Sequence, residues 1–203
     1  MFIAKLRFNL YHASTWIIVP ATKGLAGAGC SFVELVAEDA AQQKPSWFVS
    51  HAWKEPLYRF IAVVRKHSAI RLLSDGCYWI CAYANNQHNL ADEIGENPRE
   101  SAFYFALQEC RGIILVLDED ATPFRRAWCI FEESIAIDQQ QASGETERLL
   151  LDVGASDASG LAHLITDGLA GQEMDMLPVL AWHSKARREA LFPLLGMKCC
   201  ETI

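Results

Sequence analysis

The carboxylate of Glu132 is the strongest candidate for chemistry in this sequence, because an aromatic side chain precedes it by one helical turn. Trp128 and Glu132 are four residues apart, so a helix places them on one face. An aromatic ring beside a carboxylate forms a partly apolar pocket, which strengthens the interaction of the carboxylate with a developing positive charge. In the alternative, Glu132 stabilises the amino-terminal end of its helix through the helix dipole. Glu133 points about 100° away around the helix, so only one of the two faces a site.

His51 and Trp53 follow the first regular strand of the chain, where ligand-binding side chains often lie. The indole ring of Trp53 offers a stacking surface for a flat aromatic ligand, and the imidazole of His51 offers a hydrogen bond to a hydroxyl or phosphate group. In the alternative, Trp53 fills the edge of the sheet and His51 caps the following helix. Both interpretations remain open from the sequence.

Two further polar segments follow predicted strands. The loop Asn85, Asn86, Gln87, His88 and Asn89 presents amide donors and acceptors that suit the edges of a nucleotide, although Asn-rich segments also form plain turns. The loop after Asp118 leads to Arg125 and Arg126, whose guanidinium groups suit a pyrophosphate. In the alternative, the two arginines form a solvated helix face.

The elements that must position these residues alternate between strands and helices. Apolar runs predict strands at residues 15–20, 47–53, 78–83, 113–118, 148–153 and 178–182. Helical periodicity and capping residues predict helices at 31–41, 57–68, 99–110, 125–141, 161–169 and 184–195. From residue 47 onward this alternation indicates an α/β fold with a flavodoxin-like, doubly wound, parallel five-stranded sheet and helices on both faces. We expect residues 1–45 to form an N-terminal extension packed on the domain of residues 46–203.

Composition limits the class of protein. A chain of 203 residues with 51% hydrophobic residues and a net charge of −7 has a large core and no strongly basic surface, which argues against nucleic-acid binding. Seven cysteines scattered through apolar stretches suit buried thiols in the cytoplasm. No signal peptide and no membrane-spanning run are predicted.

Two other kinds of site are disfavoured. The segment Gly24–Ser31 has Cys30 where a phosphate-binding loop needs lysine. His51, Cys77, Cys81 and His88 do not form the paired spacing of a metal site, so no metal is expected.

Two short motifs carry a family resemblance. Residues 48–51 read Phe-Val-Ser-His at the end of the first strand, and Trp128, Cys129 and Glu132 form a Trp-Cys-x-x-Glu motif on the helix after the third. Together they resemble the Toll/interleukin-receptor (TIR) domain family over roughly residues 46–195. The sequence departs from the family pattern at Ala52 and Trp53, where basic residues often stand, and in the long loop after the second strand. In the alternative, Trp128 and Cys129 have a structural role and pack against the sheet.

The resemblance implies two alternative functions. A subset of TIR domains cleaves the nicotinamide–ribose bond of NAD, which yields nicotinamide and linear or cyclic ADP-ribose. In that case Glu132 is catalytic, and the substrate-binding residues are Ser50, His51, Trp53, Asn85, Asn86, His88, Arg125 and Trp128. NAD is then a substrate, and no cofactor is needed. The expected partners are further copies of the chain or other TIR-like domains. Binding to nucleic acid or to a membrane is not expected. The alternative is a non-catalytic module that self-associates in signalling complexes.

Overall fold

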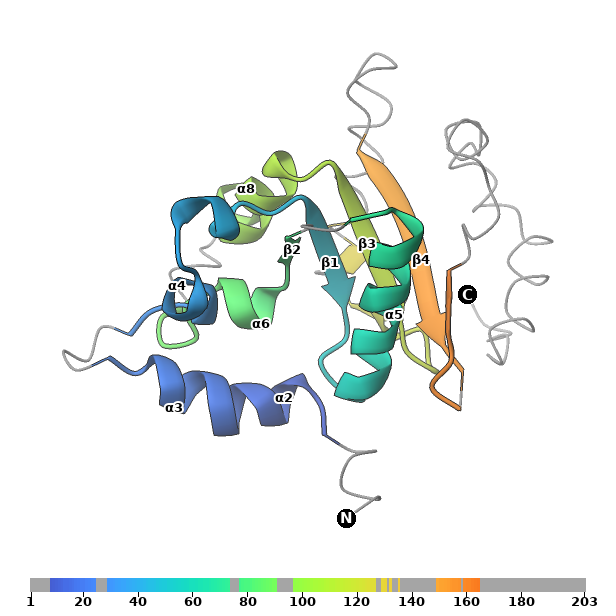
Figure 1. Cartoon of the computed structure of the whole chain (residues 1–203), viewed down its shortest axis with the longest axis horizontal. Coiled ribbons are helices and arrows are strands. Elements are labelled where there is room, and N and C mark those ends of the chain that lie inside the picture. The colour runs from blue at the N-terminus through green and yellow to red at the C-terminus, as the bar shows by residue number, and fades with distance from the viewer. Residues whose placement is uncertain are drawn as a thin grey trace.

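The computed structural model describes residues 8–24, 29–73, 77–90, 97–126, 129, 130, 132, 135, 149–157 and 159–164. These residues form an α/β fold around one five-stranded, mostly parallel sheet (Figure 1). The strands are β1 (Trp47–His51), β2 (Tyr78–Trp79), β3 (Gly112–Leu117), β4 (Leu150–Ser156) and β5 (Ala162–Leu164). Their order across the sheet is β2-β1-β3-β4-β5. The predicted α/β class is therefore confirmed.

Helices and single turns connect the strands. Before β1 lie α2 (Leu10–Ala13), the π-helix η1 (Ser14–Ile18), α3 (Val19–Thr22), α4 (Phe32–Val36) and the 3₁₀ turn η2 (Ala40–Gln43). After it come α5 (Leu57–Ile70), α6 (Cys81–Ala84), the 3₁₀ turn η3 (Pro98–Glu100), α8 (Ala102–Glu109) and the 3₁₀ turn η4 (Thr122–Arg125). Cys129, Ile130, Glu132 and Ile135 are also helical. None of the helices in the described part of the chain is long and apolar enough to cross a membrane.

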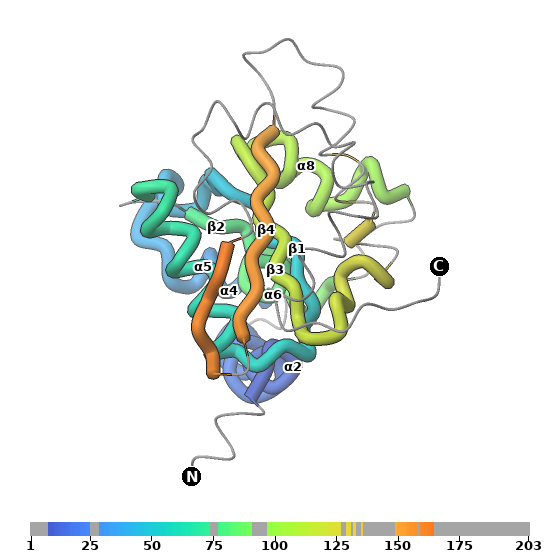
Figure 2. The backbone as a smooth tube through the Cα atoms, turned by 90° about the vertical axis from the view of Figure 1, so that its right-hand side faces the viewer, coloured from blue at the N-terminus to red at the C-terminus, as the bar shows by residue number. Residues whose placement is uncertain are grey.

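The side chains of β1 alternate between two apolar layers. Phe48 packs with Phe103 and Leu107 of α8, whereas Val49 packs with Phe60 and Val63 of α5. Successive residues of a strand point to opposite faces, so α5 and α8 cover opposite sides of the sheet. Figure 2 shows these two helices on either side of β3 and β4. All five side chains of β1 are buried as a result.

The N-terminal segment is helical where a strand was expected at residues 15–20. Asn9 caps α2 by accepting a hydrogen bond from the backbone N of His12 at 3.2 Å, and the backbone N of Asn9 donates one to Nδ1 of His12 at 3.3 Å. Leu10 and Ile18 are buried against Ala82 of α6. A run of β-branched residues is ambiguous by itself, and here the cap and one buried helical face decide its conformation.

Three further expectations differ from the structure. The second strand ends at Trp79, because Ala82 is buried against the N-terminal helices and residues 81–84 turn as α6. Residues 162–164, expected in a helix, form β5, which pairs antiparallel with β4 and so shields its edge. The sheet is therefore not wholly parallel. The strand and helix expected at 178–182 and 184–195 lie outside the described residues.

A buried polar network joins α5 to β4 toward the amino-terminal edge of the sheet. The Asp152 carboxylate accepts two hydrogen bonds from Arg71, both at 2.8 Å, and one from His67 Nε2 at 2.9 Å. The Tyr78 hydroxyl lies 2.7 Å from His67 Nδ1. Burial disfavours the charged carboxylate, but the hydrogen bonds from His67 and Arg71 outweigh it and lower the pKa of Asp152 to about 2.

We expect Asp152→Asn to lower the free energy of unfolding by about 3 kcal/mol at neutral pH, because it leaves Arg71 without its buried charge partner. The depressed pKa also means that the stabilisation from Asp152 is complete above about pH 4 and is lost as the pH falls through about 2. Urea unfolding over this pH range measures both effects. Glu109→Gln, which removes an exposed carboxylate of α8, is the control. Equal stability of the two variants would contradict a stabilising role for this network.

Candidate functional site

The site is centred on the last two residues of β1, whose side chains point to opposite faces of the sheet. Ser50 shares the face of Phe48, toward the helix that contains Glu132, and His51 shares the face of Val49, toward α5. The parallel pairing of Ser50 with Leu115 and of His51 with Val116 fixes their height in the sheet. The carboxyl ends of β1 and β3 therefore lie at the same edge, which faces α2 and α3 in Figure 1.

The Ser50 hydroxyl donates a hydrogen bond of 2.5 Å to Oε2 of Glu132. Both residues are buried, with exposed fractions of 1% and 5%. Ile135, one turn further along the helix, packs in the same apolar cluster as Phe48 and Ile113, so the face that carries Glu132 and Ile135 is turned to the sheet. The structure thus joins two residues that are 82 positions apart in the sequence.

The thiol of Cys81 interacts electrostatically with Glu132 and is hydrogen-bonded to Trp53. Nε1 of Trp53 donates a hydrogen bond to the Cys81 sulfur at 3.1 Å. Burial raises the pKa of the Cys81 thiol to about 12, the bond from Trp53 lowers it in part, and the charge of Glu132 raises it further. Cys81 therefore stays a neutral thiol at physiological pH and is a poor nucleophile. Cys81 is partly exposed, whereas Cys129 is buried, with its sulfur 4.0 Å from the carbonyl oxygen of His51.

The imidazole of His51 lies apart from Glu132, on the α5 side of β1. Its ring centroid is 4.7 Å from that of Phe60, and its Nδ1 lies 3.2 Å from the carbonyl oxygen of Val49. Because that oxygen only accepts, Nδ1 carries the proton and Nε2 presents a lone pair, for which the described residues provide no partner. His51 does not cap the following helix, whose first residue is preceded by Pro56.

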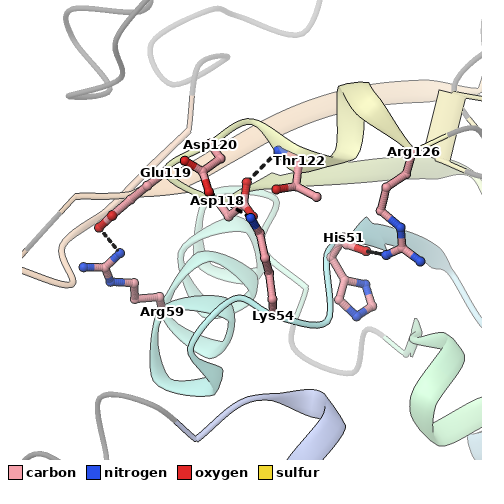
Figure 3. A network of polar contacts seen from close by, with 8 residues as sticks. All are labelled: His51, Lys54, Arg59, Asp118, Glu119, Asp120, Thr122 and Arg126. Atoms are coloured by element: carbon pink, nitrogen blue, oxygen red, sulfur yellow. Dashed lines mark hydrogen bonds and ion pairs between the residues drawn. The ribbon is translucent and has the colours of Figure 1, made fainter.

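Burial is the main cause of a low pKa at His51. The hydrogen bond to the Val49 carbonyl opposes it and the positive charge of Arg126 adds to it, so that the pKa falls to about 4. Arg126 also donates a hydrogen bond of 3.4 Å to the His51 carbonyl oxygen, as Figure 3 shows. The ring is therefore neutral at physiological pH and acts there as a hydrogen-bonding group without charge.

The polar loop after α6 divides into a buried residue and a turn. Asn85 is 2% exposed, and its Nδ2 has no hydrogen-bond partner among the described residues. Asn86 accepts a hydrogen bond from the backbone N of His88 at 3.0 Å, and Nε2 of His88 lies 3.0 Å from the Thr22 hydroxyl. The turn interpretation therefore describes Asn86 and His88, whereas the amide of Asn85 remains a candidate ligand group.

Residues 8–24 cover the edge of the sheet on which the site lies. The backbone N of Leu10 donates to the carbonyl oxygen of Trp53 at 3.1 Å, and the N of Leu57 donates to that of Phe8 at 2.7 Å. The rings of Tyr11 and Trp53 are 5.3 Å apart. Trp53 is therefore held between the N-terminal segment and Cys81. Elsewhere in the site Arg125 is exposed on η4, and Trp128 lies outside the described residues.

Acidic residues in two loops form a cavity that the sequence analysis indicated only through the loop after Asp118. It has a volume of about 450 Å³. Its lining consists of Lys54, Glu55, Pro56, Tyr58, Arg59, Asp118, Glu119 and Asp120. Glu55 was missed because it lies between Lys54 and Pro56 in an ordinary polar turn; only its position beside the carboxyl end of β1 marked it. No group of three or more metal-ligating side chains occurs in the described part of the chain.

Comparisons with known proteins place no constraint on this site. No family model matches the chain, and neither a curated protein nor a solved structure matches it.

We expect His51 to titrate with a midpoint of about 4 in an NMR measurement of its ring protons. As the pH falls from about 6.5 to about 4, the unfolded chain binds a proton at this residue that the folded chain does not, so stability decreases. His51→Gln should flatten this part of the stability profile in urea unfolding. A midpoint near 6.5 together with an unchanged profile would show that the ring is not held in a desolvated site.

Proposed function

We propose that this protein is a TIR-like NAD glycohydrolase in which Glu132 is the catalytic carboxylate. The observation that supports this most is the hydrogen bond from Ser50 to Glu132, because it connects the two motifs on which the TIR resemblance rests. The strand order β2-β1-β3-β4-β5 is compatible with the flavodoxin-like arrangement expected for such a domain. The seven cysteines scattered through apolar stretches suit an enzyme of the cytoplasm.

The proposed reaction requires little acid catalysis. The bond between the anomeric carbon of the ribose and the nicotinamide nitrogen breaks, and its electron pair leaves with nicotinamide, which departs as a neutral molecule. Glu132 stabilises the positive charge that develops on the ribose. Water then adds to the anomeric carbon and releases a proton, which gives ADP-ribose; attack by a group of the ADP-ribose itself gives a cyclic product.

Ser50 is a positioning residue in this proposal, since its hydroxyl donates to the carboxylate and does not need to touch NAD. The buried amide of Asn85 and the indole of Trp53 supply hydrogen bonding and a flat surface for the substrate. Arg125, and Trp128 by the resemblance, complete the binding residues. The internal contacts of Asn86 and His88 give these two a smaller part.

The second candidate function is a non-catalytic, self-associating signalling module. The observation that favours it is the 5% exposure of Glu132, which suits a carboxylate that holds its helix against β1 through Ser50. In this case the pair stabilises the fold, and the function lies in the surfaces that associate.

The two functions differ in the effect of Glu132→Gln on nicotinamide release from NAD. The glycohydrolase predicts that this variant, which keeps the shape of the side chain and removes its charge, loses at least about a hundredfold in kcat. Glu109→Gln is the matched control, since it removes an exposed carboxylate of α8. Liquid chromatography of the reaction mixture measures nicotinamide and both forms of ADP-ribose.

This assay is performed at low and at high protein concentration, because neighbouring copies of a self-associating domain can complete a site. Absence of nicotinamide release from the wild-type protein at both concentrations would favour the signalling module. Equal turnover of wild type and Glu132→Gln would remove Glu132 from the mechanism.

Ser50→Ala tests the positioning role. We expect kcat to fall about tenfold with little change in KM, because the carboxylate loses a hydrogen bond that fixes its orientation while the substrate contacts remain. The same change should cost about 1 kcal/mol in the free energy of unfolding. Steady-state kinetics at a temperature where both proteins are folded separates the two effects. A rise in KM with unchanged kcat would instead assign Ser50 to substrate binding.

A further inference from the structure

The acidic cavity lies between two loops at the same edge of the sheet as the Ser50–Glu132 pair. Residues 54–56, 58 and 59 line one side, from the turn after β1 into the first turn of α5, and residues 118–120 line the other, directly after β3. Figure 3 shows the ammonium group of Lys54 reaching across toward Asp118 and Asp120. Glu132 does not line this cavity. The cavity is therefore separate from the Ser50–Glu132 pair, although both lie in the same part of the fold.

Two buried carboxyl groups of the cavity are incompletely paired. Asp118 is 4% exposed; one of its oxygens accepts a hydrogen bond from the backbone N of Thr122 at 2.6 Å. Its other oxygen has no hydrogen bond among the described residues and lies 3.5 Å from Nζ of Lys54. Glu55 is 6% exposed and lines the cavity, and its carboxyl group accepts no hydrogen bond among the described residues. Asp118 Oδ2 is a buried acceptor without a donor among these residues, and Glu55 lines the same cavity, so the two carboxyl groups mark a place for a ligand that brings donors.

Two ion pairs form the outer part of the cavity. Lys54 Nζ lies 2.8 Å from Asp120, and the guanidinium of Arg59 contacts Glu119. Asp120 and Glu119 are more than 60% exposed, so these pairs contribute little to stability and can rearrange when a ligand enters. The lining contains four carboxyl groups and only two cationic side chains. A positively charged ligand offsets this excess of negative charge.

We propose that this cavity binds a small organic cation, whose ammonium or guanidinium group donates hydrogen bonds to the carboxyl groups of Glu55 and Asp118. The volume of about 450 Å³ is within the range of small-molecule sites. Lys54 already places an ammonium group 3.5 Å from the Asp118 carboxylate, and the ligand supplies a hydrogen-bond donor to Glu55, whose carboxyl group forms no ion pair among the described residues. This site is independent of NAD cleavage, since it uses neither Glu132 nor Ser50.

The affinity of the cavity for a cation depends on pH through the ionisation of Glu55. Burial raises the pKa of Glu55 to about 7; Arg59 and Lys54 lower it, and Asp118 and Glu119 raise it. Glu55 must be ionised to accept a hydrogen bond from a cation on both oxygens. Affinity for the cation therefore increases as the pH rises through about 7, and binding below this pH releases a proton.

Agmatine is a suitable probe, because it carries a guanidinium and a primary ammonium group on a short chain. Isothermal titration calorimetry with the full chain, in about 0.15 M salt to screen surface charges, measures its affinity. We expect binding to be about tenfold tighter at about pH 8 than at about pH 6, from the ionisation of one group with a pKa of about 7. Repeating the titration in buffers of different ionisation enthalpy measures the released proton.

Glu55→Gln should weaken binding at the higher pH about tenfold and abolish its pH dependence, while Glu38→Gln, at an exposed carboxylate of another loop, should change neither. Circular dichroism verifies that both variants are folded. Three outcomes overturn the proposal. The first is the absence of agmatine binding to wild type, and the second is binding that Glu55→Gln leaves unchanged. The third is binding of Mg²⁺ that depends on Glu55 while agmatine fails to bind, which would make this a metal site.

Discussion

The hydrogen bond between Ser50 and Glu132 is the contact on which the arrangement of the candidate site depends. Ser50 reaches Glu132 because β1 is buried on both faces and its alternate residues point to opposite sides. The face of the helix is fixed in turn by Ile135, which packs with Phe48 and Ile113. A shift of β1 by one residue against β3 would direct His51 toward Glu132 and Ser50 toward α5, so the register of the central strands decides which groups meet.

Asp152 and Glu55 are buried carboxyl groups at opposite edges of the sheet, and they differ in the hydrogen-bond donors around them. Toward the amino-terminal edge, Asp152 accepts hydrogen bonds from His67 and Arg71, and its low pKa reflects a charge that the fold stabilises. At the carboxyl edge, Glu55 is buried without such donors among the residues that the structure describes, and its pKa is raised. Fully paired buried charges maintain a structure, whereas incompletely paired ones raise its energy until a ligand binds. This contrast explains why we assign a structural role to the first group and ligand binding to the second.

The N-terminal segment connects these features to the rest of the chain. Its contacts with Trp53, Leu57 and Ala82 bury the turn after β1 and the start of α6. The same packing makes residues 81–84 helical, although their apolar character predicted a strand. Residues 8–24 therefore help to shape the site edge. The sequence predicted an extension packed on the domain but not which surface it covers, because that surface is formed by residues distant in the chain.

The sequence by itself determined the elements with strong local signals. The continuous apolar run of β3, the amphipathic pattern of α5 and the Trp47–His51 strand were all predictable, because burial on one or two faces sets their periodicity. It also indicated Glu132, by its spacing from an aromatic residue. Only the tertiary structure decided which groups meet: that Ser50 binds Glu132, that His51 points away from it, and that Glu55 is buried beside Asp118. These outcomes depend on strand register and on packing between distant segments. The periodicity of the sequence determines neither of them.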